Sequence, residues 1–476
     1  MNIISHFLES ARNYPNKVAI VYQSQSITFA ELRDEVYKAA VVLKQNKVEK
    51  DDNILVVIPY SIELYIHILA IFLIGANVVL VDDIKPKSSV VYAFQKSNAK
   101  IIVTLRLISL LKYFVFHYSL WKSIIFLKRK DPNPIQMVHR EPDDSALITF
   151  TSGTTGQPKA ANRTHGFLDI QLSTLIEEMK LQSGDTHITS LPVVLMCNLA
   201  VGVTSIIPPK YAKPSQWHEV RNKFAPNVLS ASPSHFSEMS QLLDCAKLDR
   251  VFIGGASILP HFARYVATKI DPSKVVLVYG STEAEPMCTL TLRDYLVSLD
   301  QDQMGLKVGI PHHNIKISIN EAESNAFHPL KDGEAGEIIV AGPHVLAHYF
   351  KDDNAFATNK ILDKNILWHK TGDAGYMIDG EVFLIGRMKY TWLENGVTCA
   401  PTTMEKYLSF HHYKEEGTWL HINGKNILFI QKTNHIDQII IDFPYKIDQT
   451  IFIEKLPRDK RHLSRIDYEA LKLLLN

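Results

Sequence analysis

The sequence predicts an α/β protein, and two changes of pattern along the chain carry that prediction. Residues 53–59 form an apolar strand pattern, 63–75 an apolar helix pattern, and 77–81 the next strand. A strand, a helix and a strand in succession indicate a parallel sheet with crossover helices. After residue 307 the pattern changes to short strands between tight turns, such as 336–340 and 381–385. We therefore expect a large domain of parallel-rich sheets with helices plus a β-rich subdomain.

The length of the chain predicts more than one domain. The chain has 476 residues, which exceeds what one core usually supports. Its 46% hydrophobic and 21% charged residues are an ordinary composition for a globular protein. Beyond Arg387 two short strand patterns flank Asn423-Gly424, which is a hairpin signal. We expect a large domain over residues 1–388 and a small α+β C-terminal domain over 389–476.

Charge and cysteine usage exclude several classes of protein. The formal net charge is +1, and no basic pattern interleaved with aromatic residues suggests nucleic-acid binding. The four cysteines have neither disulfide-framework nor zinc-ligand spacing. The N-terminus lacks the basic start and apolar core of a secretion signal. We expect a cytoplasmic protein without a nucleic-acid partner.

One basic and apolar segment allows two interpretations. Residues 84–130 contain no acidic side chain, and Lys112 and Lys122 interrupt the apolar run, which excludes a clean transmembrane helix. The favoured interpretation is an ordinary strand and helix with a solvated basic face. The alternative is peripheral contact with an anionic membrane.

A loop rich in glycine and hydroxyl groups follows the apolar strand pattern 146–150. Glycine lets backbone N–H groups turn toward an anion, hydroxyls add neutral donors, and a lysine adds charge. It is not a Walker A loop, because the closing Gly-Lys-Ser/Thr is absent. The candidate phosphate ligands are Thr151, Ser152, Gly153, Thr154, Thr155, Gly156 and Lys159.

A second strand pattern, 275–279, ends in another glycine and hydroxyl run with a carboxylate suited to a hard cation. This run is Tyr279, Gly280, Ser281, Thr282 and Glu283. The alternative is a purely structural role, in which Thr282 is the N-cap of a helix and Glu283 is an acidic residue in its first turn.

Two further motifs follow, Thr371-Gly372-Asp373 and Gly386-Arg387. In this order the four motifs resemble the adenylate-forming superfamily of acyl- and aryl-CoA synthetases, peptide-synthetase adenylation domains and luciferases. The resemblance spans residues 28–459. The phrases 163–167, 279–286 and 457–462 are most similar to the fatty-acid ligase-like branch that contains β-lactone synthetases.

The resemblance implies a ligase that uses ATP and Mg²⁺ to activate a carboxylic acid as its acyl-adenylate, with release of pyrophosphate. The first loop would hold the β- and γ-phosphates, Thr282 the α-phosphate and Glu283 the Mg²⁺ ion. Asp373 and Arg387 would bind the ribose. The resemblance further assigns the adenine and acyl pockets to the segment Gly254, Gly255 and Ala256, and a hinge between two half-reactions to Lys389.

Two departures from the family pattern bear on the reaction. Arg465 occupies the position of the family's C-terminal catalytic lysine, with Lys460 as the alternative in another register. Arginine keeps the charge but has a planar, bulkier head. The C-terminal domain is also short, which weakens the case for a CoA-binding surface.

The expected function is activation of an aliphatic or fatty acid, suggested by the apolar stretch 191–199, followed by transfer to CoA or to the thiol of a separate carrier protein. One alternative is a β-lactone synthetase, in which the hydroxyl of a 3-hydroxy acid attacks its own adenylate. The other is a non-catalytic relative that binds nucleotide or acyl group.

Overall fold

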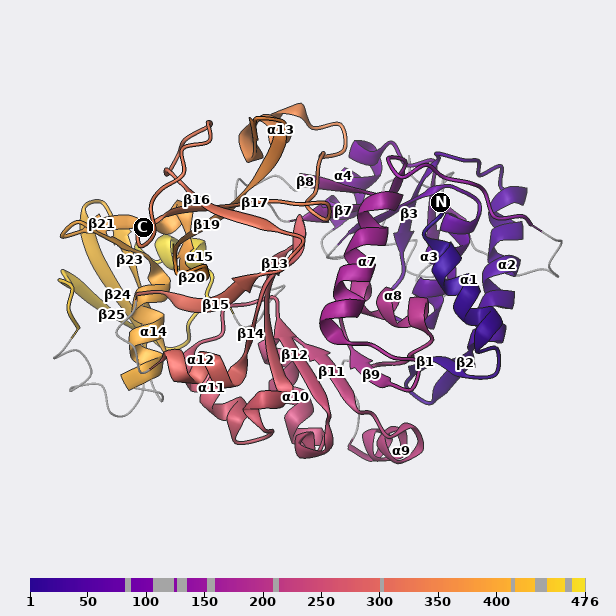
Figure 1. Ribbon diagram of the computed structural model, residues 1–476, viewed down its shortest axis with the longest axis horizontal. Helices are drawn as coiled ribbons and strands as arrows, with labels where there is room; N and C mark the ends of the chain where they lie inside the picture. Colours follow the sequence, from indigo (N-terminus) through magenta and orange to yellow (C-terminus); the bar gives the residue numbers. More distant parts are fainter. Residues whose placement is uncertain are drawn as a thin grey trace. The chain divides into compact units, whose positions relative to one another are not determined.

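The computed structural model describes residues 1–81, 87–105, 124–125, 135–151, 159–208, 214–299, 304–411, 416–432, 443–458 and 465–475. The chain divides into two compact units (Figure 1). The first comprises Met1–Ser230 and Pro343–Ala357, and the second comprises Ala231–Gly342 and Thr358–Asn476.

The first unit contains a six-stranded sheet in the order β6-β5-β3-β4-β7-β8. All neighbouring pairs are parallel except β7 with β8. The strands are β3 (Asn53–Val57), β4 (Asn77–Val81), β5 (Ile101–Thr104), β6 (Ile124–Ile125), β7 (Ser145–Thr151) and β8 (Lys159–Thr164). The helices that link the parallel strands are α3 (Ile62–Leu73) and α4 (Lys87–Ser97). Helix α3 is apolar nearly all round and almost wholly buried, as expected of a core crossover helix.

A second group of strands in this unit runs in the order β11-β9-β10-β1-β2. They are β1 (Val18–Tyr22), β2 (Gln25–Thr28), β9 (Thr186–Thr189), β10 (Thr204–Ile207) and β11 (Val228–Ala231). The helices are α1 (Ile4–Asn13), α2 (Phe29–Gln45), α7 (His165–Met179), α8 (Pro192–Val201) and α9 (Pro214–Phe224), and α13 (Asp353–Asn359) begins in this unit. A capping box formed by Thr28 and Glu31 starts α2.

The second unit is built on a sheet in the order β16-β17-β19-β20-β15-β14-β13-β12, with β18 beside β19. Only β12 and β13 are parallel among these pairs. The strands are β12 (Arg250–Gly254), β13 (Val275–Ser281), β14 (Ala284–Thr291), β15 (Leu306–Pro311), β16 (Lys316–Asn320), β17 (Gly336–Ala341), β18 (Lys360–Asp363), β19 (Ile366–Ile378) and β20 (Glu381–Arg387). The helices are α10 (Pro233–Leu242), α11 (Pro260–Ala267) and α12 (Leu292–Ser298), with short 3₁₀ turns η2 (Cys245–Lys247), η3 (Pro272–Lys274) and η4 (Met388–Tyr390).

The remainder of this unit, gold to yellow in Figure 1, is a smaller α+β arrangement. Its elements are β21 (Trp392–Glu394), β22 (Val397–Cys399), α14 (Pro401–His411), β23 (Gly417–Ile422), β24 (Lys425–Gln431), β25 (Gln449–Ile453) and α15 (Tyr468–Leu473). Asn423 and Gly424 both have positive φ in the β23-β24 turn, so the predicted hairpin is confirmed.

The α/β prediction is confirmed, including the change to short antiparallel strands after residue 307. The domain boundary at Lys389 stays a prediction. The compact second unit continues past it, because Ala400 packs with Ala374, Tyr376 and Phe383 in one buried cluster.

Among the described residues, no helix is both long and apolar enough to cross a membrane. The basic segment that raised the membrane question lies mostly outside the described residues. All four cysteines are buried, in keeping with their expected role as small hydrophobic side chains.

Candidate active site

Thr282 and Glu283 form the two-residue turn of the β13-β14 hairpin, in which Ser281 pairs with Ala284. The N–H of Glu283 donates to Ser281 Oγ at 3.2 Å. Because a strand and not a helix follows, the N-cap interpretation of this pair is wrong. A tight hairpin turn holds both side chains at the end of β13, where hydroxyl and carboxylate oxygens gather on one short segment.

Asp373 is the centre of a polar cluster built from three strands. It lies on β19 directly opposite Arg387 of β20, and its Oδ1 is 3.1 Å from the Nη1 atom of Arg387. The hydroxyl of Tyr279, on β13, donates to Asp373 Oδ2 at 2.7 Å. Tertiary folding thus joins three residues that the sequence motifs had selected separately.

The electrostatics of this cluster follow from burial beside charge. Burial and the Asp373 carboxylate raise the pKa of Tyr279 well above its usual value, so the phenol stays protonated and donates. Asp373 raises the pKa of Arg387 as well. The Asp373 side chain is 10% exposed and that of Arg387 is 36% exposed, so the ion pair is accessible from one side. Such a carboxylate can accept hydrogen bonds from the hydroxyls of a ligand.

Gly254 ends β12 and Gly255 follows it. Gly255 has φ +82, and a Cβ on Gly254 would lie 2.8 Å from the Val278 carbonyl oxygen, so only glycine fits this close strand pairing. The carbonyl of Gly255 accepts a hydrogen bond from Arg465 Nη2 at 2.7 Å. The guanidinium therefore reaches the segment that contains Gly254, Gly255 and Ala256. Lys460, its alternative, lies outside the described residues.

One further ionisable residue, which interacts with Glu283, was not identified from the sequence. Lys360, the first residue of β18, is 7% exposed. Burial lowers the pKa of its ammonium group to about 7, and the Glu283 carboxylate opposes that shift. Its sequence neighbourhood carries no motif, so only the tertiary structure identifies it.

The two ends of the candidate phosphate loop, Thr151 and Lys159, lie in the first unit. Thr151 ends β7 and Lys159 begins β8, and the two residues pair across this antiparallel hairpin. Ser152, Gly153, Thr154, Thr155 and Gly156 lie outside the described residues. The Lys159 ammonium is 5.9 Å from the centroid of the Tyr349 ring, and Tyr349 forms a bridge with Ala161. The strand predicted before the loop is confirmed as β7.

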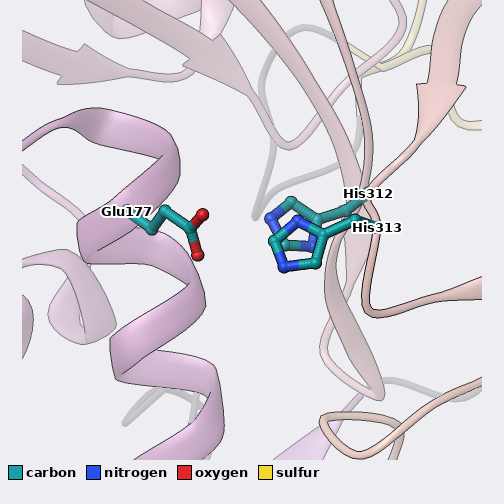
Figure 2. A group of neighbouring side chains, drawn as sticks. All are labelled: Glu177, His312 and His313. Atoms are coloured by element: carbon teal, nitrogen blue, oxygen red, sulfur yellow. The ribbon is translucent and has the colours of Figure 1, made fainter.

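His312 and His313 follow β15, and no sequence motif had identified them. The rings of His312 and His313 are 4.2 Å apart between centroids and tilted by 37° (Figure 2). His312 is buried and His313 is exposed. Glu177, also drawn in Figure 2, is an exposed residue of α7 in the first unit.

Comparison with known proteins gives a family match over most of the chain. The model of the AMP-binding enzyme family matches residues 7–350. The chain is 25% identical over 443 residues to 4-coumarate–CoA ligase 2 of Nicotiana tabacum, covering 86% of this chain and 80% of the relative. It is 25% identical over 423 residues to bacitracin synthase 1 of Bacillus licheniformis, covering 85% of this chain and 8% of that protein.

Solved structures show the same fold. O-succinylbenzoate–CoA synthetase of Bacillus subtilis in complex with AMP aligns with a TM-score of 0.79 and 20% identity over 95% of both chains. ATP-bound MatB of Rhodopseudomonas palustris aligns with a TM-score of 0.83 and 19% identity, covering 99% of this chain and 98% of that one.

Proposed function

Because this chain belongs to the AMP-binding enzyme family, we propose that it uses ATP to convert a carboxylic acid into an acyl-adenylate, with release of pyrophosphate. The acyl group then passes to CoA or to the thiol of a separate carrier protein. The observation that carries the proposal is the cluster of Asp373, Arg387 and Tyr279, in the same unit as the Thr282–Glu283 turn.

In the first step a carboxylate must approach the α-phosphate of ATP, so neutralisation of charge and positioning supply most of the catalysis. Asp373 would accept the ribose hydroxyls, and Arg387 would hold that carboxylate in place. Thr282 would donate to the α-phosphate from the hairpin turn. Lys159 and the loop from Thr151 to Gly156 would hold the β- and γ-phosphates.

The donor set fits Mg²⁺, which prefers oxygen ligands. Glu283 offers its carboxylate from a turn that also presents the hydroxyls of Ser281 and Thr282. When bound, the ion would offset the negative charge of the phosphates. A solved structure of the same fold supports ATP and Mg²⁺, since O-succinylbenzoate–CoA synthetase of Bacillus subtilis has been solved with ATP and a magnesium ion.

Arg465 would perform the role that the C-terminal catalytic lysine has in the family, since it occupies the same position. Its guanidinium is within hydrogen-bond distance of Gly255, and it carries the same charge as lysine. A planar head with several donors can hold two oxygens of an acyl-phosphate at once, whereas an ammonium acts as a point charge.

The acid that we propose is aliphatic or fatty. The apolar stretch that suggested this is now helix α8, whose Val194, Leu195 and Leu199 are buried. Helix α8 packs on α1 and α7, which accounts for its apolar character without a substrate. The substrate class therefore rests on the resemblance of residues 163–167 and 457–462 to fatty-acid ligases, and relatives include coumarate ligases that are named for an aromatic acid.

A second candidate is a β-lactone synthetase acting on a 3-hydroxy acid. The resemblance of residues 163–167, 279–286 and 457–462 to the branch that contains β-lactone synthetases favours it. The two candidates share the adenylation step and differ in the acceptor.

The test is carboxylate-dependent conversion of ATP to AMP and pyrophosphate by the purified full chain. Fatty, 3-hydroxy fatty and aryl acids are each supplied with and without CoA. AMP that requires CoA supports a CoA ligase, and steady AMP release from 3-hydroxy acids alone supports lactone formation. If no acid gives AMP although ATP binds, the chain is a non-catalytic relative or requires a carrier protein, and the CoA reaction is excluded.

Arg465→Ala should lower the adenylation rate by about a hundredfold, the usual effect of losing one donor to a developing negative charge, while Arg465→Lys restores most of it. Arg33→Ala, at an exposed ion pair with Asp34, is the matched control and should stay within twofold of the parent. An Arg465→Ala variant as active as the control would remove Arg465 from the proposed mechanism.

A further inference from the structure

Within β19, Thr371–Asp373 form a local turn where the register with β17 shifts, and side chains hold the backbone of this turn. The N–H of Gly372 donates to Glu337 Oε1 at 3.1 Å. The N–H of Asp373 donates to Thr371 Oγ1 at 3.1 Å, and that hydroxyl donates to the Ile338 carbonyl at 2.7 Å. Both N–H groups of the turn are therefore fixed to β17, the strand that carries Glu337 and Ile338.

The carboxylate that holds Gly372 is a buried charge with a buried partner. The Glu337 side chain is 7% exposed and that of Lys370 is 12% exposed, and Lys370 Nζ lies 3.4 Å from Glu337 Oε2. Lys370 also donates to the Ser324 carbonyl at 3.0 Å. Burial raises the pKa of Glu337, while Lys370 and the Gly372 N–H oppose that shift.

A buried ion pair is a weak source of net stability, since desolvation of both charges offsets their attraction. This pair does have a geometric effect. Gly372 has φ +71 and nothing within 4 Å of a Cβ built on it, so no packing at this position restrains the backbone. The hydrogen bonds from the Gly372 N–H to Glu337 and from the Asp373 N–H to Thr371 restrain the turn.

We propose that Glu337 and Lys370 are positioning residues for nucleotide binding: Glu337 fixes the Thr371–Asp373 turn so that the Asp373 carboxylate faces the ribose hydroxyls, and Lys370 offsets the buried charge of Glu337. The inference rests on the proposed function, because it takes the ribose as the ligand of Asp373. Neither residue touches the ligand, and both act through the turn.

The physical expectation is a selective loss. Removing Glu337 frees the Gly372 N–H and leaves Lys370 without its buried partner. The carboxylate of Asp373 then samples several positions, and a displacement of about 1 Å is sufficient to lose a well-oriented contact. Affinity for a ligand with ribose hydroxyls should fall, while affinity for one without them should change little.

The experiment is calorimetric titration of the full chain with AMP and with 2′,3′-dideoxyadenosine monophosphate. The parent should bind AMP more tightly, by roughly tenfold. The double variant Glu337→Ala/Lys370→Met, which leaves no unpaired buried charge, should lose that preference. Glu337→Gln keeps an oxygen acceptor for the Gly372 N–H and should retain the preference for AMP. If only the charge of Glu337 mattered, this neutral variant would lose the preference.

The matched control is Glu381→Gln/Lys307→Met, which removes another ion pair of the same sheet. In this pair Lys307 Nζ lies 2.6 Å from Glu381 Oε1. The control should leave the preference for AMP unchanged. Thr371→Val provides a second variant that tests the same turn from the Asp373 side, should the double variant not fold. It should weaken the preference as well.

Retention of the hydroxyl preference in both the double variant and Thr371→Val would overturn the inference while the proposed function stands. Equal binding of the two nucleotides by the parent would overturn the ribose assignment of Asp373, and the inference with it. Absence of AMP binding by the folded parent would overturn the proposed nucleotide site itself.

Discussion

Asp373, the residue that we propose as the ribose ligand, is oriented by its protein contacts alone. One carboxylate oxygen accepts from Tyr279 and the other faces Arg387. A carboxylate has about four lone-pair sites, so these contacts leave capacity for incoming hydroxyls. The residue is therefore oriented before a ligand arrives, which reduces the entropy lost on binding.

His165 shows the opposite case, a titratable residue with a structural role. It begins α7 and is 1% exposed, and its Nδ1 accepts from the N–H of Ile3 at 3.2 Å. Burial lowers the pKa of His165 to about 4. Protonation would break the hydrogen bond and place a charge in the core, so the folded state keeps the ring neutral.

We expect the free energy of unfolding to decrease as the pH falls from about 6.5 to about 4. In that window the unfolded chain binds a proton at His165, whose ordinary pKa is 6.5, and the folded chain does not. The contribution is fully present above pH 6.5, and the loss approaches about 3 kcal/mol at the acid end. Urea unfolding at a series of pH values measures it.

His165→Gln should flatten this dependence on pH. The control is His139→Gln, because the His139 side chain is 74% exposed; its slope should match that of the parent. If the parent and His165→Gln have the same slope, another group titrates in this window.

At the scale of elements, an irregularity in the pairing of β19 with β20 places the ribose-binding candidates. Asp373 pairs with Arg387 and Ala374 with Gly386, but Gly375 pairs with Leu384, so the register shifts between Ala374 and Gly375. Bulges of this kind re-aim side chains at the end of a sheet. The shift lets Asp373 and Arg387 face each other.

Gly375→Ala should disturb this arrangement. A Cβ at this position would lie 2.4 Å from the Phe383 carbonyl oxygen and 2.7 Å from Ile338 Cδ1, and the backbone atom cannot move without altering the pairing. We expect a loss of about 2 kcal/mol in the free energy of unfolding, together with weaker AMP binding. Chemical unfolding and calorimetric titration measure the two effects.

Gly184→Ala is the matched control, since nothing lies within 4 Å of a Cβ there, and neither quantity should change. A Gly375→Ala variant that keeps the stability and affinity of the parent would show that the bulge tolerates a side chain and does not set the site geometry.

At the scale of the whole molecule, the residues after Lys389 are tied to the rest of the second unit. The His261 N–H and Nδ1 both contact Ser409 Oγ, at 2.8 and 2.7 Å. Arg264 Nη1 donates to the Phe410 carbonyl at 3.2 Å. Arg465 Nη2 donates to the Gly255 carbonyl at 2.7 Å. A hinge at Lys389 would have to break contacts of this kind.

A chain truncated after Met388 should therefore be less stable than the full chain. Ala400 leaves the buried cluster that contains Ala374, Tyr376 and Phe383, and the exposed apolar surface should lower the melting temperature by several degrees and increase binding of a hydrophobic dye. Calorimetry and dye fluorescence check this, with Lys389→Ala in the full chain as the control. An unchanged melting temperature would support an independent domain after residue 388.

The fold and much of the candidate site could be predicted because their signals are local. Alternation of apolar segments identified the sheets, and the Asn423-Gly424 hairpin followed from its turn residues. The resemblance to the adenylate-forming superfamily is confirmed by the family match. The N-cap alternative failed because a neighbour in space decides the local structure: Thr282 and Glu283 lie in a hairpin turn because β14 pairs back on β13.

By itself the sequence determined the α/β class, the family and the identity of the motif residues, because apolar periodicity and turn composition act over a few positions. Only the tertiary structure decided which of them meet. Tyr279 and Asp373 are 94 residues apart and Gly255 and Arg465 are 210 apart, and burial gave Glu337, Lys370 and Lys360 their partners. Such contacts depend on the register of strands brought together by burial of the core, which no local pattern encodes.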